Sequence, residues 1–121
     1  MSNQNNFGQE GENIAANFLR NKGYEILETN WQHGHKEIDI IAMQKKTLVI
    51  VEVKSRSANF IVSPADAVNR KKQKLLVEAA DFYVNKLILN VEVRFDIVSV
   101  VANGKTYKIE HIEDAFYPLL K

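Results

Sequence analysis

The sequence has no cysteine, little glycine or proline, and no long apolar run. Its 121 residues include 5 Gly and 2 Pro. The absence of cysteine excludes disulfide scaffolds, thiolate zinc sites and cysteine nucleophiles. The apolar runs are far shorter than the ~20 residues that a helix needs to span a bilayer. Because the N-terminus also has no basic and then apolar leader, we expect no membrane association and a cytoplasmic protein.

The composition that remains is that of one globular domain. Hydrophobic residues make up 45% of the chain and charged residues 26%, which excludes a low-complexity or disordered protein. A chain of this length can bury most of its apolar surface around one core. We therefore expect a single domain over residues 1–121, with the polar residues 1–7 flexible.

Charge is balanced overall but uneven along the chain. The net charge is +1, from 16 basic and 15 acidic residues. Between positions 54 and 74, however, six basic residues accompany a single acid, Asp66. Such a segment is either a solvated helix face or a surface that binds phosphate groups. The six are Lys54, Arg56, Arg70, Lys71, Lys72 and Lys74.

Hydrophobic periodicity predicts an α/β protein. Apolar residues at helical spacing indicate helices over 9–21 and 64–86, the second starting at Ser63-Pro64. Strands are predicted over 24–31, 37–43, 47–55, 91–101 and 107–112, with a turn at Asn103-Gly104 and a short final turn over 116–120. The order of helix, three strands, helix and two strands predicts a mixed central sheet flanked by helices.

Two of these strands carry charged residues among apolar ones. Glu37 and Asp39 lie two apart, as do Glu52 and Lys54, so each pair points to one face of its strand. One interpretation is a structural salt bridge in which Lys54 neutralises an acid. The other is a Mg²⁺ site formed by Asp39, Glu52 and the carbonyl of Val53, with Lys54 acting on the attacking water and on the developing charge.

These residues resemble a known nuclease signature. Asp39, followed thirteen positions later by Glu52-Val53-Lys54, resembles the PD-(D/E)XK motif, with Ile38 in place of the Pro. A longer ordered set, from about residue 8 to residue 100, resembles the YraN-like family, an uncharacterised bacterial family similar to archaeal Holliday junction resolvases. The set comprises Gly8-x-x-Gly11-Glu12, Gly23-Tyr24, Glu37-Ile38-Asp39, Glu52-Val53-Lys54-x-Arg56, Lys72-Gln73 and Arg94-Phe95-Asp96.

The resemblance implies a three-layer restriction-endonuclease-like sandwich and a role for each matching residue. Glu12, Asp39 and Glu52 match the acids that hold Mg²⁺ or Mn²⁺, and Lys54 matches the catalytic lysine. The alternative for Glu12 is an acid favoured by the dipole of a first helical turn. Lys36 stands where the family usually has Gly, and its charge is a candidate phosphate contact. The expected nucleic-acid-binding residues are Lys36, Arg56, Arg70, Lys71, Lys72 and Gln73.

The sequence therefore predicts a metal-dependent endonuclease that hydrolyses phosphodiester bonds in DNA, with branched DNA among its substrates. Two alternatives remain: a nuclease fold that binds nucleic acid without cutting it, and a structural protein whose acids form a salt-bridge network. The similar resolvases are two-fold dimers, which suggests a homodimer. His33 and His35 are expected in an exposed turn, and Asp96 is expected to pair internally rather than bind metal.

Overall fold

A computed structural model describes residues 3–57, 68–87 and 90–116. The predicted order of helix, three strands, helix and two strands is confirmed within these residues. The elements are α1 (Asn3–Asn21), β1 (Glu25–His33), β2 (Lys36–Gln44), β3 (Thr47–Ser57), α2 (Arg70–Leu87), β4 (Glu92–Asn103) and β5 (Thr106–Ile112).

The strands form one mixed sheet in the order β1-β2-β3-β4-β5. Neighbours are antiparallel except for β3 and β4, which run parallel over the whole length of β3, from Thr47 opposite Glu92 to Ser57 opposite Ala102. A parallel pair needs a long crossover connection, and α2 lies in the segment that makes it. The predicted α/β class with a mixed sheet is confirmed.

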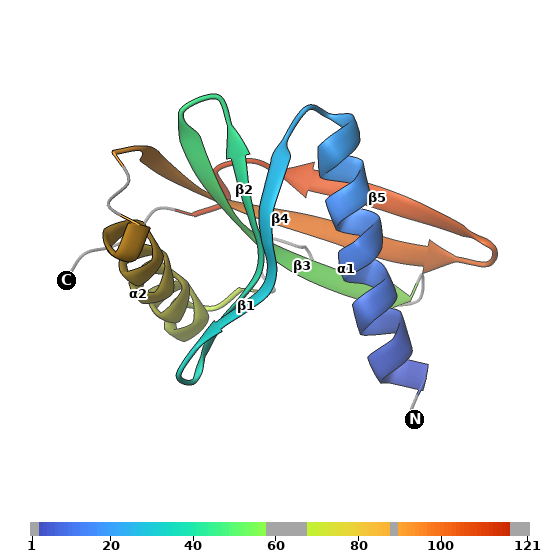
Figure 1. The fold of residues 1–121 in the computed structure, drawn as a ribbon. Helices are drawn as coiled ribbons and strands as arrows, with labels where there is room; N and C mark the ends of the chain where they lie inside the picture. The colour runs from blue at the N-terminus through green and yellow to red at the C-terminus, as the bar shows by residue number, and fades with distance from the viewer. Residues whose placement is uncertain (1–2, 58–67, 88–89, 117–121) are drawn as a thin grey trace.

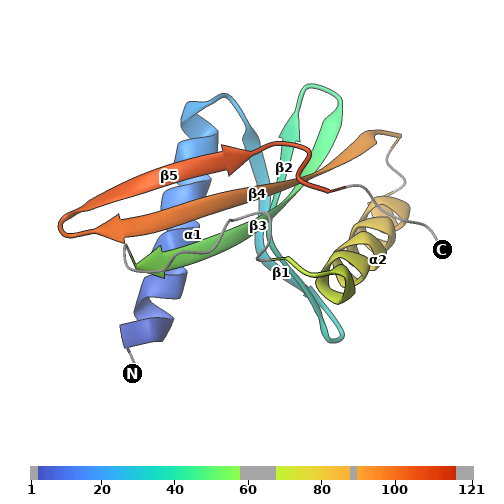
Figure 2. The same ribbon diagram turned by 180° about the vertical axis from the view of Figure 1, so that it is seen from behind.

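The two helices cover opposite faces of the sheet. In Figure 1, α1 lies in front of β3, β4 and β5, and in the reverse view of Figure 2 these strands lie in front of α1. The core on the α1 face includes Ala15, Leu19, Ile40, Val49, Val51 and Val98. The core on the α2 face includes Ile41, Leu48, Ile50, Leu76, Ala80, Tyr83 and Phe95. The molecule is therefore a three-layer sandwich.

Strand β3 shows why both faces are covered. Val49 and Val51 are fully buried against α1, whereas Leu48 and Ile50 are buried against α2. Side chains alternate between the faces of a strand, and here both sets are apolar, as predicted for a central strand. The same alternation directs Glu52 toward the α2 face.

The helix starts differ from those predicted. Helix α1 begins at Asn3, six residues before the predicted start at residue 9. Helix α2 begins at Arg70 rather than at residue 64, because Asn69 Oδ1 accepts a hydrogen bond from the Lys72 N–H at 2.9 Å and so caps the helix. The predicted start at Ser63-Pro64 lies outside the described residues, as does the part of the final turn over 117–120.

A glycine ends α1, as the sequence predicts. Gly23 takes φ 95° and its N–H donates to the Arg20 carbonyl at 3.0 Å, which ends the helix in the left-handed conformation that glycine favours.

Among the described residues, neither this helix nor any other is both long enough and apolar enough to cross a membrane.

Candidate active site

The site begins where β2 separates from β3. The residue pairs between the two strands end at Ile40 and Val51, although β1 stays paired with β2 as far as His33 and Lys36. Beyond this point the Asp39 side chain takes the place of a backbone partner, because its Oδ2 accepts a hydrogen bond from the Val53 N–H at 2.8 Å. Asp39 is therefore fixed beside the central strand by a backbone donor.

Glu52 lies one residue before Val53 on β3 and is almost completely buried, with 3% of its surface exposed. Its Oε2 lies 3.4 Å from the Nζ of Lys54 and 3.4 Å from the Nζ of Lys72 on α2. Its Oε1 is buried and has no hydrogen-bond partner within residues 3–57, 68–87 and 90–116. Two ammonium groups thus lie beside one carboxylate oxygen, while neither of them contacts the other oxygen.

Helix α1 brings Glu12 to the same region. The helix packs so closely on β3 that a Cβ added at Gly11 would overlap the Ser55 Oγ. Glu12 Oε1 is buried, and no described residue forms a hydrogen bond with it. Burial raises the pKa of Glu12, and the charges of Glu37 and Glu52 raise it further, against a hydrogen bond from Asn30 that lowers it.

Among these acids, Asp39 has the largest shift in pKa. Burial is the main cause that raises its pKa to about 8, and the nearby charge of Glu52 adds to it. The Val53 N–H opposes the change by stabilising the ionised form, and Glu12 contributes repulsion in the same direction as Glu52. The acids therefore lie close enough to oppose one another's ionisation, in spite of the two lysines on Glu52.

The donor set suits a hard divalent cation in part. Within residues 3–57, 68–87 and 90–116, no group of three or more His, Asp or Glu side chains is arranged to hold a metal ion. Mg²⁺, however, is commonly bound by one or two carboxylates and keeps several waters. Asp39 and Glu52 supply two carboxylates, and the described part of the chain gives the buried Oε1 atoms of Glu52 and Glu12 no hydrogen-bond donor. These residues fit a Mg²⁺ or Mn²⁺ ion held by few protein ligands.

The predicted nucleic-acid contacts surround the start of α2. Arg70 and Lys71 are exposed in its first turn, which contains no acidic residue. Lys72 is predicted from the sequence to face a phosphate, and the structure places its Nζ on Glu52. The Gln73 side chain donates to the Val68 carbonyl at 2.9 Å, which ties the first turn of the helix to the residue before its cap.

Two further candidates lie on β2 and β3. Lys36 is partly exposed at the start of β2, opposite His33 of β1. Arg56 is partly exposed near the end of β3, two residues after Lys54. The contact between Lys72 and Glu52 is not predictable from the sequence, because twenty residues separate the two and the spacing alone gives no register between α2 and β3.

Asp96 belongs to a separate network on the α1 face. It is fully buried, and it accepts hydrogen bonds from Arg94 at 2.9 Å and from the Asp114 N–H at 3.0 Å, with His111 Nε2 at 2.7 Å. Burial raises its pKa, but the hydrogen bonds from His111, Arg94 and Asp114 outweigh burial and lower the pKa overall. The predicted internal pairing of Asp96 is confirmed.

Comparison with known proteins identifies the family of the chain. Residues 11–100 match the model of the uncharacterised protein family UPF0102. A UPF0102 protein of Parabacteroides distasonis is 48% identical over 117 residues, covering 97% of each chain. One of Flavobacterium psychrophilum is 50% identical over 117 residues, covering 97% of this chain and 98% of the relative. One of Porphyromonas gingivalis is 45% identical and covers 100% and 91% of the two chains.

Proposed function

The chain belongs to the uncharacterised protein family UPF0102, and we propose that it is a metal-dependent nuclease that hydrolyses phosphodiester bonds in DNA, branched DNA included. We also propose that the protein acts in the cytoplasm as a homodimer. The proposed activity depends on the site where β2 separates from β3.

The observation that carries the proposal is the unbalanced burial of acids around Asp39. A structural ion pair is stabilising only when its charges are matched and its hydrogen bonds are complete. Here the pKa values of both Asp39 and Glu12 are raised, and the Oε1 atoms of Glu12 and Glu52 are buried without a hydrogen-bond partner among the residues that the structure describes. A divalent cation would offset this repulsion and satisfy these oxygens, so a metal site explains the arrangement better than a salt bridge does.

Asp39 and Glu52 would hold the ion, with the carbonyl of Val53 and with Glu12 directly or through water. When bound, Mg²⁺ or Mn²⁺ would polarise a phosphoryl oxygen and lower the pKa of a coordinated water. Lys54 lies beside Glu52, with its side chain 22% exposed. From there its ammonium group can orient the attacking water and offset the negative charge that develops on the phosphate.

The start of α2 would hold the nucleic-acid backbone. Cations in the first turn of a helix are unfavourable for the helix, because its N-terminus already carries partial positive charge. Arg70, Lys71 and Lys72 occupy that turn with no acid among them. The same combination of a helix dipole and basic side chains is well suited to phosphate. Since Lys72 also reaches Glu52, this end of α2 connects the backbone-binding surface to the acids.

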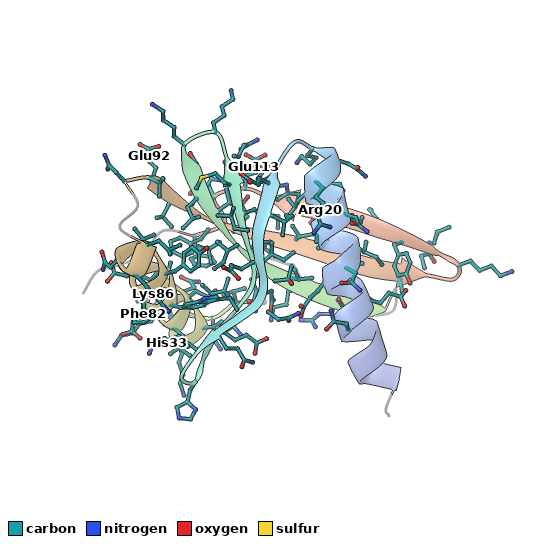
Figure 3. All side chains as sticks on the ribbon, viewed as in Figure 1. Arg20, His33, Phe82, Lys86, Glu92 and Glu113 are labelled. Carbon is teal, nitrogen blue, oxygen red and sulfur yellow. The ribbon has the colours of Figure 1, made fainter. Side chains whose placement is uncertain are left out.

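The proposal is tested by a cleavage panel. Labelled duplex, flap, four-way junction and single-stranded DNA are incubated with the protein and Mg²⁺, Mn²⁺ or EDTA. We expect cleavage of at least one substrate with metal, none with EDTA, and none by Asp39→Asn. The matched control is Glu92→Gln, which removes one exposed carboxylate at the opposite end of the sheet (Figure 3) and should cleave like the unaltered protein.

A second candidate function is nucleic-acid binding without cleavage. It is favoured by the two lysines that already contact Glu52, and by the absence of a three-group metal cluster among the residues that the structure describes. In that case DNA would bind to the unaltered protein and to Asp39→Asn equally well, and no substrate of the panel would be cut with either metal.

A further inference from the structure

A pocket lies away from the acids, between α2 and the hairpin that joins β1 to β2. Its volume is about 360 Å³, and Figure 3 shows two of its residues, His33 and Phe82, next to each other. From α2 it is lined by residues at positions 78, 81, 82 and 85, which share one helix face. The lining residues are His33, Lys36, Glu78, Asp81, Phe82 and Asn85.

Aromatic rings form one wall of this pocket. The His33 ring stacks on the Phe82 ring with 3.5 Å between centroids and 18° between planes. Trp31 lies 6.2 Å from each of these rings and is tilted by 23° from His33. His33 is exposed, whereas Phe82 and Trp31 are partly buried. The sequence predicts this imidazole in an exposed turn. The structure places it at the end of β1, still exposed but stacked on the partly buried Phe82 ring, which makes a surface for another planar group.

The polar residues that line the pocket determine which hydrogen-bonding groups a bound planar group can carry on its edge. Glu78 and Asp81 offer carboxylate oxygens, which accept hydrogen bonds and repel phosphate. They therefore repel the nucleic-acid backbone from the α2 side of the pocket and favour a base with N–H donors there. Guanine presents two adjacent donors, N1–H and the N2 amino group, to a single carboxylate. Lys36, on the hairpin side, supplies a cation for the phosphate of the same nucleotide.

We propose that this pocket binds an unpaired guanine base, stacked on His33 and hydrogen-bonded to Asp81 or Glu78. The inference rests on the proposed function, since it names the feature by which the site would select branched or single-stranded DNA. Unpaired bases are commonly recognised by stacking on aromatic rings and by hydrogen bonds to the Watson–Crick edge.

The position of the pocket along α2 agrees with this role. Lys72, which contacts Glu52, precedes the lining residues by six to thirteen positions, or about 9–20 Å along the helix axis at 1.5 Å per residue. On the hairpin side, Lys36 precedes Asp39 by three residues on the same strand. A strand that enters the site would thus place a neighbouring nucleotide, rather than the one that is cut, at the pocket.

The test measures binding without cleavage. Hairpin DNAs that carry a single unpaired guanine, an unpaired adenine or an abasic position at one site are titrated in EDTA by fluorescence anisotropy. The chain contains one tryptophan, so quenching of Trp31 reports independently whether the base enters the pocket. We expect guanine to bind roughly tenfold more tightly than the abasic position, the size of one base–aromatic stack, and to quench Trp31.

Three variants separate the contribution of stacking from that of hydrogen bonding. His33→Ala should reduce the gain of guanine over the abasic position to less than about twofold, because the stacking surface is lost. Asp81→Asn combined with Glu78→Gln should keep the gain from stacking but abolish the preference of guanine over adenine. The control is His35→Ala, which removes an exposed imidazole of the same hairpin that does not line the pocket, and it should leave both preferences unchanged.

The outcomes distinguish this inference from the proposed function. Equal affinity for guanine and abasic DNA, an equal effect of His33→Ala and His35→Ala, or no DNA binding at all would overturn the pocket assignment. If DNA is cut with Mg²⁺ but no base preference is found, the nuclease proposal stands and the pocket fails. If guanine is preferred but no DNA is cut with either metal, the pocket stands and the nuclease fails.

Discussion

Asp39 gives the clearest prediction for a single residue, because its pKa is raised to about 8 by burial and by neighbouring acids. In the unfolded chain this carboxyl has an ordinary pKa of about 4 and is ionised above it. Between these values the folded protein binds more protons than the unfolded one. The metal-free protein should therefore lose stability as the pH rises from about 4 through about 8.

Urea unfolding in EDTA between pH 5 and pH 9 checks this dependence. The substitution Asp39→Asn keeps a side-chain oxygen for the Val53 N–H but removes the charge. This variant should therefore be more stable than the unaltered protein at pH 8 by about 1–3 kcal/mol, given that one pKa unit represents about 1.4 kcal/mol. The difference should shrink toward pH 5. A variant that is less stable at every pH would contradict the electrostatic account of this residue.

Single residues also show what the sequence can and cannot predict. The internal pairing of Asp96 was predictable, because Arg94 lies two positions away on the same face of a strand. Its contact with His111 was not, since the two are joined only through the register of β4 and β5. Likewise Glu52 and Lys54 share a face by alternation, whereas Lys72 reaches Glu52 only through tertiary packing.

At the scale of elements, the first turn of α2 should govern how DNA binding depends on salt. Each phosphate contact that is lost should flatten the plot of log affinity against log salt by about one unit. Replacing Arg70 and Lys71 by Ala should therefore reduce the slope by up to about two units and weaken binding to all sequences alike. Both residues are exposed and outside the group of acids, so the fold should not change.

The matched control is the pair Lys45 and Lys46, in the turn between β2 and β3 at the far end of these strands from Asp39. Replacing both by Ala removes the same charge as the α2 variant does. Both slopes are measured by fluorescence anisotropy over a series of salt concentrations. Equal slopes for the two double variants would show that the basic start of α2 is a solvated helix face that does not contact phosphate.

Helix α1 offers a prediction with an unusual sign. In a helix interior, Gly→Ala normally stabilises by about 0.5–1 kcal/mol. At Gly11 the added methyl would overlap the Ser55 Oγ, so Gly11→Ala should destabilise the protein by about 1–3 kcal/mol as the packing is forced apart. Thermal unfolding checks this, and Ser55→Ala should recover part of the loss. A more stable Gly11→Ala would show that α1 is not held against β3 at this point.

Element boundaries show the limits of periodicity. Continuous Val and Ile over β3 indicate a covered central strand, and both faces are indeed buried. The predicted start of α2 is too early. Ser63-Pro64 is a favourable helix start in the sequence, but in the structure Asn69 caps the helix by accepting a hydrogen bond from the Lys72 N–H. The hydrophobic pattern does not predict that β2 separates from β3 at Asp39, because the buried apolar residue Ile38 lies beyond that point.

At the scale of the whole molecule, the topology explains how a protein of net charge +1 can present a basic surface beside an acidic site. The parallel pairing of β3 with β4 requires a crossover, and that crossover brings the start of α2 beside Glu52 of β3, where Lys72 lies 3.4 Å from the carboxylate. The six basic residues between positions 54 and 74 are thereby divided between the end of β3 and the start of α2. The mixed sheet followed from the sequence, but the register that joins its acids required the structure.

The central claim is that Asp39, Glu52 and Lys54 form a catalytic site rather than a structural ion network. The most direct test is the single-turnover cleavage rate of Lys54→Ala with Mg²⁺, on whichever DNA of the panel is cut, with its free energy of unfolding measured in the same buffer. Because Lys72 remains on Glu52, we predict a rate lower by a factor of about 10²–10³ with stability changed by about 1 kcal/mol or less. An unchanged rate, or a loss of about 3–5 kcal/mol of stability as expected when a buried charge loses its partner, would contradict the account.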